Sequence, residues 1–347
     1  MSKTGNVVAD IPFPKLNPAF VPIKIDSDTV CLRAGPWSGP TINMVDEDSE
    51  HSLMDLIEMF DGTNHVKDIL SEFSPEERDE LTDLIRSLHS SSILYNDDGS
   101  SPSDAWPNLV LSGAFGAEQH ENLESSSPLV VSKDGLGEKT VSRLLDVGVG
   151  GVTCTGEAVS TELAEKDLVR TVGFDELERE VDRAEYILYV SEKPRPKLLE
   201  ELNKLCHEYG TPWSIGQILG FDGMVGPTVF PGETACYRCF EERTLANLKE
   251  SSRETYRRYL REFEEDNLST VTLEPFSDLV VGYLVMDAVY LLGYGHGFTV
   301  GRSINVSGLD LSVDVNDVLR LPRCDVCGKE QGRDFSRIID AVDIPGE

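Results

Sequence analysis

Two Cys-x-x-Cys pairs limit, more than any other feature, what this chain can fold into. Cys236 and Cys239 lie in "GETACYRCF", directly after a Pro-Gly turn, and Cys324 and Cys327 lie in "PRCDVCG" much further along. Four thiolates from two such turns complete the tetrahedral coordination of zinc, and a site without an open position is structural rather than catalytic. We therefore expect these cysteines to bind one zinc ion, which joins the segment after Cys239 to the C-terminal part of the chain.

The alternative for these pairs is a redox-active dithiol. Such a pair normally opens the helix after the first strand of a βαβ unit, where the thiol pKa is lowered, and neither pair has that position. The remaining cysteines lie in apolar or strand-like runs and are expected to be buried and inert: Cys31, Cys154 and Cys206.

The N-terminal residues, "MSKTGNVVADIPFPK", lack the apolar core of a signal peptide, and no apolar run approaches the roughly 20 residues of a membrane span. We expect a cytoplasmic protein without membrane contact, in which reduced cysteines favour metal binding over disulfides. The chain carries 62 acidic and 31 basic residues, a formal net charge of −31, which would repel nucleic acid and anionic lipid. The acidic residues occur throughout the chain, which favours a halophilic source; an ordinary acidic mesophile protein is the alternative.

Four regions follow from the sequence pattern: a flexible N-terminus over 1–17, a first domain over 18–96, a linker over 97–127 rich in Ser, Asp, Gly and Pro, and a second domain over 128–347. The first domain is expected to contain three short strands, three helices and a closing strand, an arrangement that resembles a winged helix-turn-helix module. Its third helix has the strongest start signal, with Ser74 as N-cap, Pro75 at the first helical position and Glu77 three residues after the cap.

Strands and helices alternate from residue 128 onward. "PLVV", "GVTCTG", "AEYILYV" and "TPWSIGQ" are expected strands, and the intervening segments have helical periodicity. This alternation predicts an α/β domain with a parallel, doubly wound sheet. The stretch over 240–295 is mainly helical, with an apolar helix over 276–294 that suits either a core or a dimer interface, and a C-terminal hairpin leads into the second cysteine pair.

A nucleotide-binding loop is expected after the first strand of such a domain, and here it reads "SKDGLGEKTVSRLL". Gly135 and Gly137 remain of the glycines that approach a phosphate. The loop begins with Ser132-Lys133-Asp134, however, and Glu138 beside the helix start would repel a phosphate. We expect no ATP binding and no catalytic residue in this chain.

Three segments carry a resemblance to a known family: "GLGEKTVSRLLDVGVGGV", "GPTVFPGETACYRCFEERTLAN" and "RLPRCDVCG". They resemble the ThiF-like, ubiquitin-activating-type fold. More narrowly, "PGETACYRCFEER" resembles the cyclodehydratase partner proteins of thiazole/oxazole-modified microcin biosynthesis. The resemblance implies structural zinc at the four paired cysteines, a leader-peptide clamp near the N-terminus, a YcaO-type cyclodehydratase as catalytic partner, and a possible homodimer through the ThiF-like domain.

The implied clamp is the edge of a sheet, where an extended leader peptide can add as a strand. By this analogy the edge is the third strand, Thr41, Ile42, Asn43, Met44 and Val45, and the groove wall is the helix that begins at Pro75, with Leu81 and Leu84. The alternative is that Leu81, Leu84, Ile85 and Leu88 are mostly core. The acidic excess of this domain favours a leader with basic or apolar anchors.

Three functions therefore remain open. The first is a non-catalytic scaffold that binds a precursor leader peptide and presents it to the cyclodehydratase. The second is an ATP-dependent adenylating activator of a carrier-protein C-terminus, which the altered loop disfavours. The third is a winged-helix transcription regulator, which the acidic segment "PEERDELTDLIRSLH" disfavours because a DNA-recognition helix should be basic.

Overall fold

The computed structural model describes residues 11–36, 41–46, 52–91, 93–97, 117–156, 159–264 and 272–328. It divides the chain into two compact units, Met1–Glu121 and Asn122–Glu347. Each unit is described here by itself. Most of the predicted linker, 98–116, lies outside the described residues.

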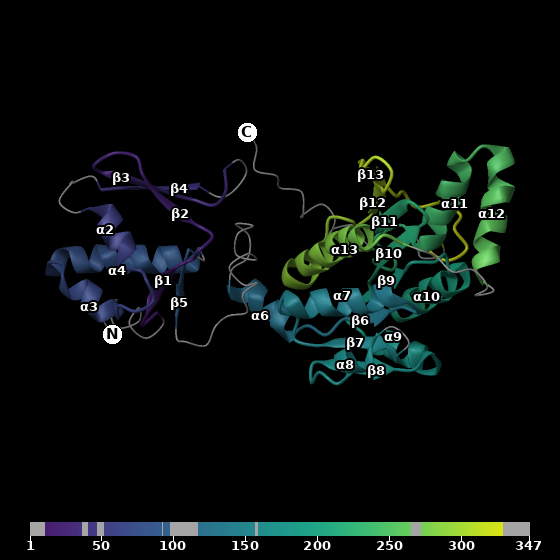
Figure 1. Cartoon of the computed structure of the whole chain (residues 1–347), viewed down its shortest axis with the longest axis horizontal. Coiled ribbons are helices and arrows are strands. Elements are labelled where there is room, and N and C mark those ends of the chain that lie inside the picture. The colour runs from purple at the N-terminus through teal and green to yellow at the C-terminus, as the bar shows by residue number, and fades with distance from the viewer. Residues whose placement is uncertain are drawn as a thin grey trace. The chain divides into compact units, whose positions relative to one another are not determined.

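Unit 1 contains a three-stranded antiparallel sheet in the order β2-β3-β4: β2 (Val21–Lys24), β3 (Thr29–Arg33) and β4 (Thr41–Val45). Three helices lie against one face of this sheet: α2 (Leu53–Glu58), α3 (Val66–Ser71) and α4 (Pro75–Ser90) (Figure 1). A separate pair joins β1 (Pro14–Leu16) to β5 (Leu94–Asn96). The unit contains the three strands, three helices and closing strand that the sequence predicts, and in addition β1, which lies within the segment 1–17 that was expected to be a flexible N-terminus.

The start of α4 confirms the predicted capping signal. Ser74 Oγ accepts a hydrogen bond from the Glu77 backbone N–H at 3.4 Å, and the Glu77 carboxylate accepts one from the Ser74 N–H at 2.7 Å. The apolar face of the helix packs Ile85 and Leu88 against strand residues such as Leu32.

Unit 2 is built on an eight-stranded sheet in the order β13-β12-β11-β10-β9-β6-β7-β8. Five neighbouring strands run parallel: β6 (Leu129–Val131), β7 (Val152–Thr155), β8 (Val169–Val172), β9 (Ile187–Ser191) and β10 (Trp213–Leu219). Three antiparallel strands extend the sheet: β11 (Asp222–Val225), β12 (Arg302–Ser307) and β13 (Val313–Asp317). The predicted parallel sheet and C-terminal hairpin are confirmed, whereas β8 and β11 were not expected.

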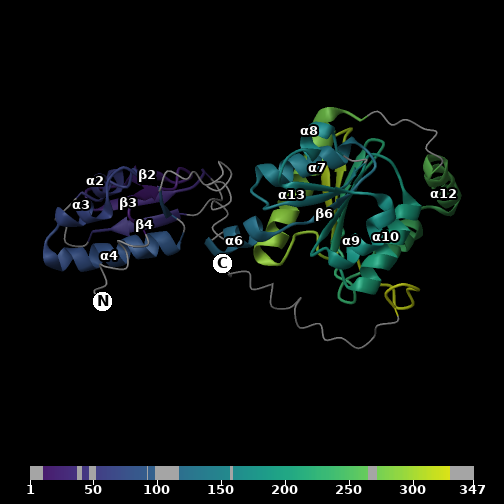
Figure 2. The same ribbon diagram turned by 90° about the horizontal axis from the view of Figure 1, so that it is seen from below.

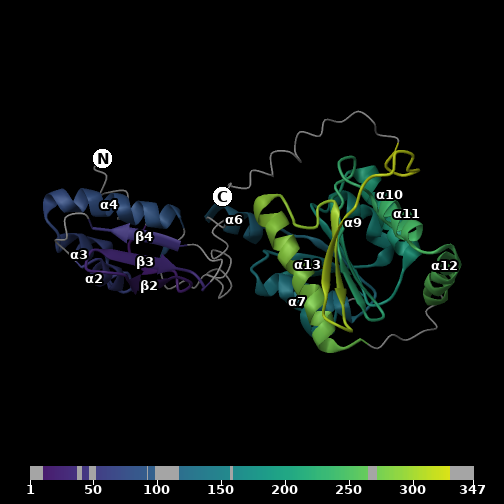
Figure 3. The ribbon, with the colours of Figure 1, turned by 90° about the horizontal axis from the view of Figure 1, so that it is seen from above.

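Helices cover both faces of this sheet (Figures 2 and 3). One face carries α7 (Gly135–Asp146) and α13 (Glu274–Tyr294), and the other carries α9 (Leu177–Arg183), α10 (Pro196–Tyr209) and α11 (Tyr237–Asn247). The remaining helices are α6 (Ala117–Ser125), α8 (Thr161–Ala164) and α12 (Glu250–Glu264).

Helix α13 is the predicted apolar helix, and it packs on β10 and β11. The approach is close because two strand residues are glycines: a Cβ atom at Gly216 would lie 2.8 Å from Leu284, and one at Gly223 would lie 2.5 Å from Val280. The helix is long and apolar enough to cross a membrane, contrary to the expectation for the sequence, but 61% of its most apolar window is buried within the unit. Its position is that of a core helix.

Candidate metal centre and binding surfaces

The structure brings the four predicted ligands together. Cys236 is the N-cap residue of α11 and Cys239 lies in its first turn, while Cys324 and Cys327 lie in the turn that follows β13. All four sulfur atoms lie within 4.8 Å of one another, and each residue is at most 6% exposed. Zinc with bonds of about 2.3 Å to four sulfur atoms holds neighbouring sulfur atoms about 3.8 Å apart. The separations between Sγ atoms of 3.9, 3.6 and 3.4 Å are compatible with that geometry, so the cluster could hold a metal ion.

Hydrogen bonds between side chains and the backbone hold the two cysteine-containing segments together. The Arg320 guanidinium donates to the carbonyls of Gly232 (2.8 Å) and Cys327 (2.7 Å), which belong to the two different turns. The Leu321 N–H lies 3.3 Å from the Cys239 Sγ, a donor that stabilises a thiolate. At Gly328 a Cβ atom would lie 2.4 Å from the Cys324 carbonyl oxygen, so the second turn can close only around a glycine.

The four thiols also perturb one another. Hydrogen bonding to Cys239 and Cys327, followed by burial, raises the pKa of Cys236, whereas hydrogen bonds from Cys236 and Cys239 lower the pKa of Cys327. Neighbouring buried sulfur atoms therefore cannot all ionise unless a cation compensates their charge. By contrast, Cys154 and Cys206 are isolated, and burial alone raises the pKa of Cys154 to about 11, as expected for inert thiols.

The loop before α7 is closed by a side chain of its own. Asp134 is the N-cap residue of α7: its Oδ1 accepts from the Leu136 N–H (3.3 Å), and its Oδ2 accepts from the Ser191 hydroxyl (2.8 Å) and the Glu192 N–H (3.1 Å). Free N–H groups at a helix start are what phosphate-binding loops offer. Here the Asp134 carboxylate accepts from one of these groups, the Leu136 N–H. Glu138, the carboxylate that the sequence leads us to expect near a phosphate, accepts from the Ser160 hydroxyl at 2.6 Å. An Asp directly before a helix is an N-cap signal and could have identified Asp134.

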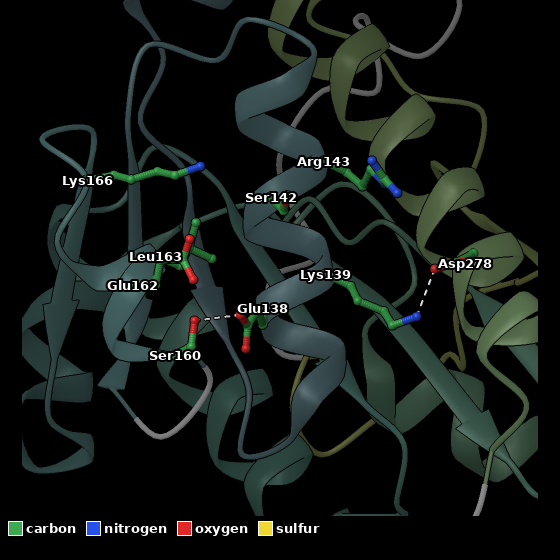
Figure 4. Close-up of a pocket in the computed structure, with 9 residues that line it drawn as sticks. All are labelled: Glu138, Lys139, Ser142, Arg143, Ser160, Glu162, Leu163, Lys166 and Asp278. Atoms are coloured by element: carbon green, nitrogen blue, oxygen red, sulfur yellow. Dashed lines mark hydrogen bonds and ion pairs between the residues drawn. The ribbon is translucent and has the colours of Figure 1, made fainter.

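A cavity of about 440 Å³ lies on the outer side of α7, between this helix, α8 and α13 (Figure 4). Its charged side chains largely neutralise one another: Lys139 pairs with Asp278 at 2.8 Å and with Glu274, and Arg143 pairs with Asp146. The charges of this cavity therefore do not favour one class of ligand.

The predicted peptide edge of unit 1 lies at the end of its sheet, because β4 pairs with β3 alone among the described strands. Thr41, Asn43 and Val45 are exposed, Ile42 is half-buried and Met44 is buried. On α4, Leu81 is only 6% exposed and belongs to the core, as do Ile85 and Leu88, so only Leu84 of the two predicted groove leucines retains accessible surface.

No family model and no curated protein sequence matches the chain. Solved structures do match. The microcin C7 biosynthetic enzyme MccB in complex with N-formylated MccA is 15% identical with a TM-score of 0.60, and the match covers 91% of this chain and 99% of that one. E. coli MccB with ATP has 15% identity, a TM-score of 0.58 and the same coverage. The chain has the ThiF-like fold predicted from its sequence.

A heterocyclase in complex with substrate and cofactor is a further neighbour. It is 14% identical with a TM-score of 0.64, and the match covers 91% of this chain but only 39% of the heterocyclase. In each case the matched part of this chain is longer than either unit, so the similarity includes residues of both.

Proposed function

We propose that the protein binds the leader segment of a ribosomally made precursor peptide and presents that peptide to a separate YcaO-type cyclodehydratase for azoline or azole formation. The observation that carries this proposal is the fold shared with MccB in complex with the MccA peptide, over residues of both units. The heterocyclase bound to its substrate supports the same class of function, because the chain matches 39% of a larger enzyme, as a scaffold subunit would.

Unit 1 is the leader-binding module in this proposal, of the winged-helix type. Its β4 offers an open edge for strand addition, and half-buried Ile42 and Leu84 offer apolar contacts beside that edge. The four clustered cysteines hold structural zinc, which ties α11 to the segment after β13 and thereby supports unit 2. In this proposal the protein is cytoplasmic and halophilic, and it forms a homodimer through the ThiF-like unit.

The observation that supports a non-catalytic role is that Asp134 caps α7 where a phosphate-binding loop would offer its N–H groups. The competing function is an ATP-dependent adenylating activator, and the observation that favours it is the fold shared with ATP-bound MccB. The sequence of α4, "PEERDELTDLIRSLHS", has more acidic than basic residues and therefore does not support the function of a transcription regulator.

The test is to search the neighbouring genes for a short Cys/Ser/Thr-rich peptide and to titrate the full chain with a synthetic leader of such a peptide by isothermal titration calorimetry. We expect binding, and we expect Leu84→Asp to raise the Kd at least tenfold, or about 1.4 kcal/mol. Leu53→Asp is the matched control, because Leu53 is also half-buried against the unit 1 core but lies on α2. Absence of leader binding, or equal losses in both variants, would contradict the proposal. Peptide-dependent ATP–pyrophosphate exchange by the chain alone would establish the adenylating function instead.

A further inference from the structure

The eight-stranded sheet of unit 2 ends in an open strand. β13 occupies one end of the strand order, and β12 is its only partner within the described part of the chain (Figure 1). All five of its residues are exposed. The backbone N–H and C=O groups on its outer edge are thus free to pair with an added strand.

The two faces of the sheet differ at this edge. Val313 and Val315 point to the α13 side, since they lie in register with Val306 and Ile304, and they are 44% and 62% exposed. On the opposite side Asp314 lies in register with Asn305 and, through it, with Met224 and Gln217, while Asn316 lies in register with Ser303. A strand added at β13 would meet apolar side chains on one face and polar ones on the other.

The polar face is the floor of a cavity of about 560 Å³, walled by α11 and α12. The wall contributes aromatic rings from Tyr237, Phe240 and Tyr256. Ser303 and Asn305 contribute polar groups to the floor of this cavity.

The charges that line the cavity favour a cationic ligand. Four acidic residues line it, Asp222, Glu241, Asp314 and Asp317, against the single base Arg243. Arg243 donates to the Leu319 and Arg320 carbonyls, Glu241 pairs with Arg238 and Asp317 pairs with Arg302. Asp222 and Asp314 form no ion pair with any described residue, which leaves two carboxylates at the mouth of the cavity.

We propose that β13 binds an extended segment of another polypeptide in which apolar and basic residues alternate. The segment adds a ninth strand to the sheet and places a lysine or arginine side chain in the cavity, between the carboxylates of Asp222 and Asp314 and the aromatic wall of α11 and α12. A second copy of this chain fits the edge poorly, because its own β13, "VDVND", would bring two further carboxylates and no basic residue to it. The proposal does not depend on the leader-binding surface of unit 1.

The probe is the peptide Val-Arg-Val-Arg-Val-amide, labelled with fluorescein at its N-terminus, titrated with the full chain and followed by fluorescence anisotropy. The test variant is Asp222→Asn with Asp314→Asn. The control is Glu201→Gln with Glu208→Gln, which removes the same charge from two exposed residues of α10. We expect the test variant to raise the Kd at least tenfold and the control to change it less than twofold. Thermal unfolding of each variant checks that the fold is intact.

Two altered peptides separate a specific site from general attraction to an acidic protein. A peptide with citrulline in place of arginine keeps the shape without the charge, and a peptide N-methylated at alternate residues loses backbone donors. Both are expected to bind at least tenfold more weakly than the probe. Equal loss of binding in the test and control variants, unchanged binding of the citrulline peptide, or no binding of the probe would each overturn the proposal.

Discussion

At the scale of single residues, individual side chains have their largest effect on the structure at the cysteine cluster and at the start of α7. The cysteine side chains become a possible ligand set only because two turns, distant in sequence, meet at Sγ–Sγ distances that suit tetrahedral coordination. Asp134 acts over a shorter range, since one carboxylate caps a helix and also accepts from the end of β9. A metal-ligand set and a helix cap both act through direct contacts in space, but they contribute differently to the free energy of unfolding.

We expect Cys324→Ser to abolish stoichiometric zinc binding, because the three remaining thiolates leave one of the four coordination positions of the ion open. The free energy of unfolding of unit 2 should fall by at least about 3 kcal/mol, since metal binding to such a site is part of the folding free energy. Zinc content by mass spectrometry and urea unfolding measure the two effects. Cys31→Ser in unit 1 is the control and should retain the metal. A metal-free wild-type protein that unfolds with unchanged stability would contradict the zinc assignment.

At the scale of elements, the edge of the parallel sheet depends on a buried carboxylate. Glu180 in α9 is 2% exposed, and it accepts from Arg170 in β8 and from Arg179. The hydrogen bond from Arg170 outweighs burial and lowers the pKa of Glu180. The pair joins β8, whose short and mostly exposed sequence "VRTV" has little apolar surface of its own, to the helix that covers it.

We expect Glu180→Gln to reduce the free energy of unfolding at pH 7 by about 1–3 kcal/mol, the range for a hydrogen-bonded charge. Because the pKa of Glu180 is lower in the folded than in the unfolded chain, its contribution is complete above the ordinary glutamate value of about 4.3 and is lost as the pH falls through the folded value. Urea unfolding between pH 7 and pH 3.5 should therefore show the wild type and the variant converging in acid. Asp182→Asn, at an exposed position of the same helix, should leave the difference near zero at every pH. A constant difference would contradict the role of the ionised carboxylate.

The whole molecule carries a net charge of −31, which opposes any compact state through self-repulsion. The described ion pairs reduce this repulsion only locally, as between Lys139 and Asp278. Mobile cations screen charges beyond about 10 Å at 0.1 M salt and beyond about 3 Å at 1 M. Salt should accordingly be a main determinant of stability, whatever the source of the protein.

We expect the Tm to rise by several degrees between 0.1 and 2 M KCl, because screening weakens the repulsion among the exposed acids. Differential scanning calorimetry measures this rise. Sucrose at matched osmolality controls for the general effect of excluded cosolutes and should produce a smaller shift. A Tm that is flat or falls with KCl would show that self-repulsion does not limit stability and would weaken the halophilic interpretation.

Much of the fold was predictable from the chain because its signals are local. The capping box at Ser74, the helical periodicity of α7 and α10, and the apolar runs of β6, β9 and β10 depend on residues a few positions apart. Two elements that escaped prediction lack such signals: β8 is an exposed edge strand, and β11, "DGMV", begins like a turn and is a strand through its pairing with β10 and β12, with α13 packed over Gly223.

The sequence by itself therefore determined most of the secondary structure, the parallel α/β class and the choice of four cysteines as candidate metal ligands, since each follows from residue type and spacing. Only the tertiary structure decided that the cysteine turns meet, that Leu81 belongs to the core while Leu84 keeps accessible surface, and that Asp134 closes the loop before α7. The same holds for the open edge at β13 and the acidic cavity beside it. Each of these depends on the distance between residues far apart in the chain, which spacing along the chain does not encode.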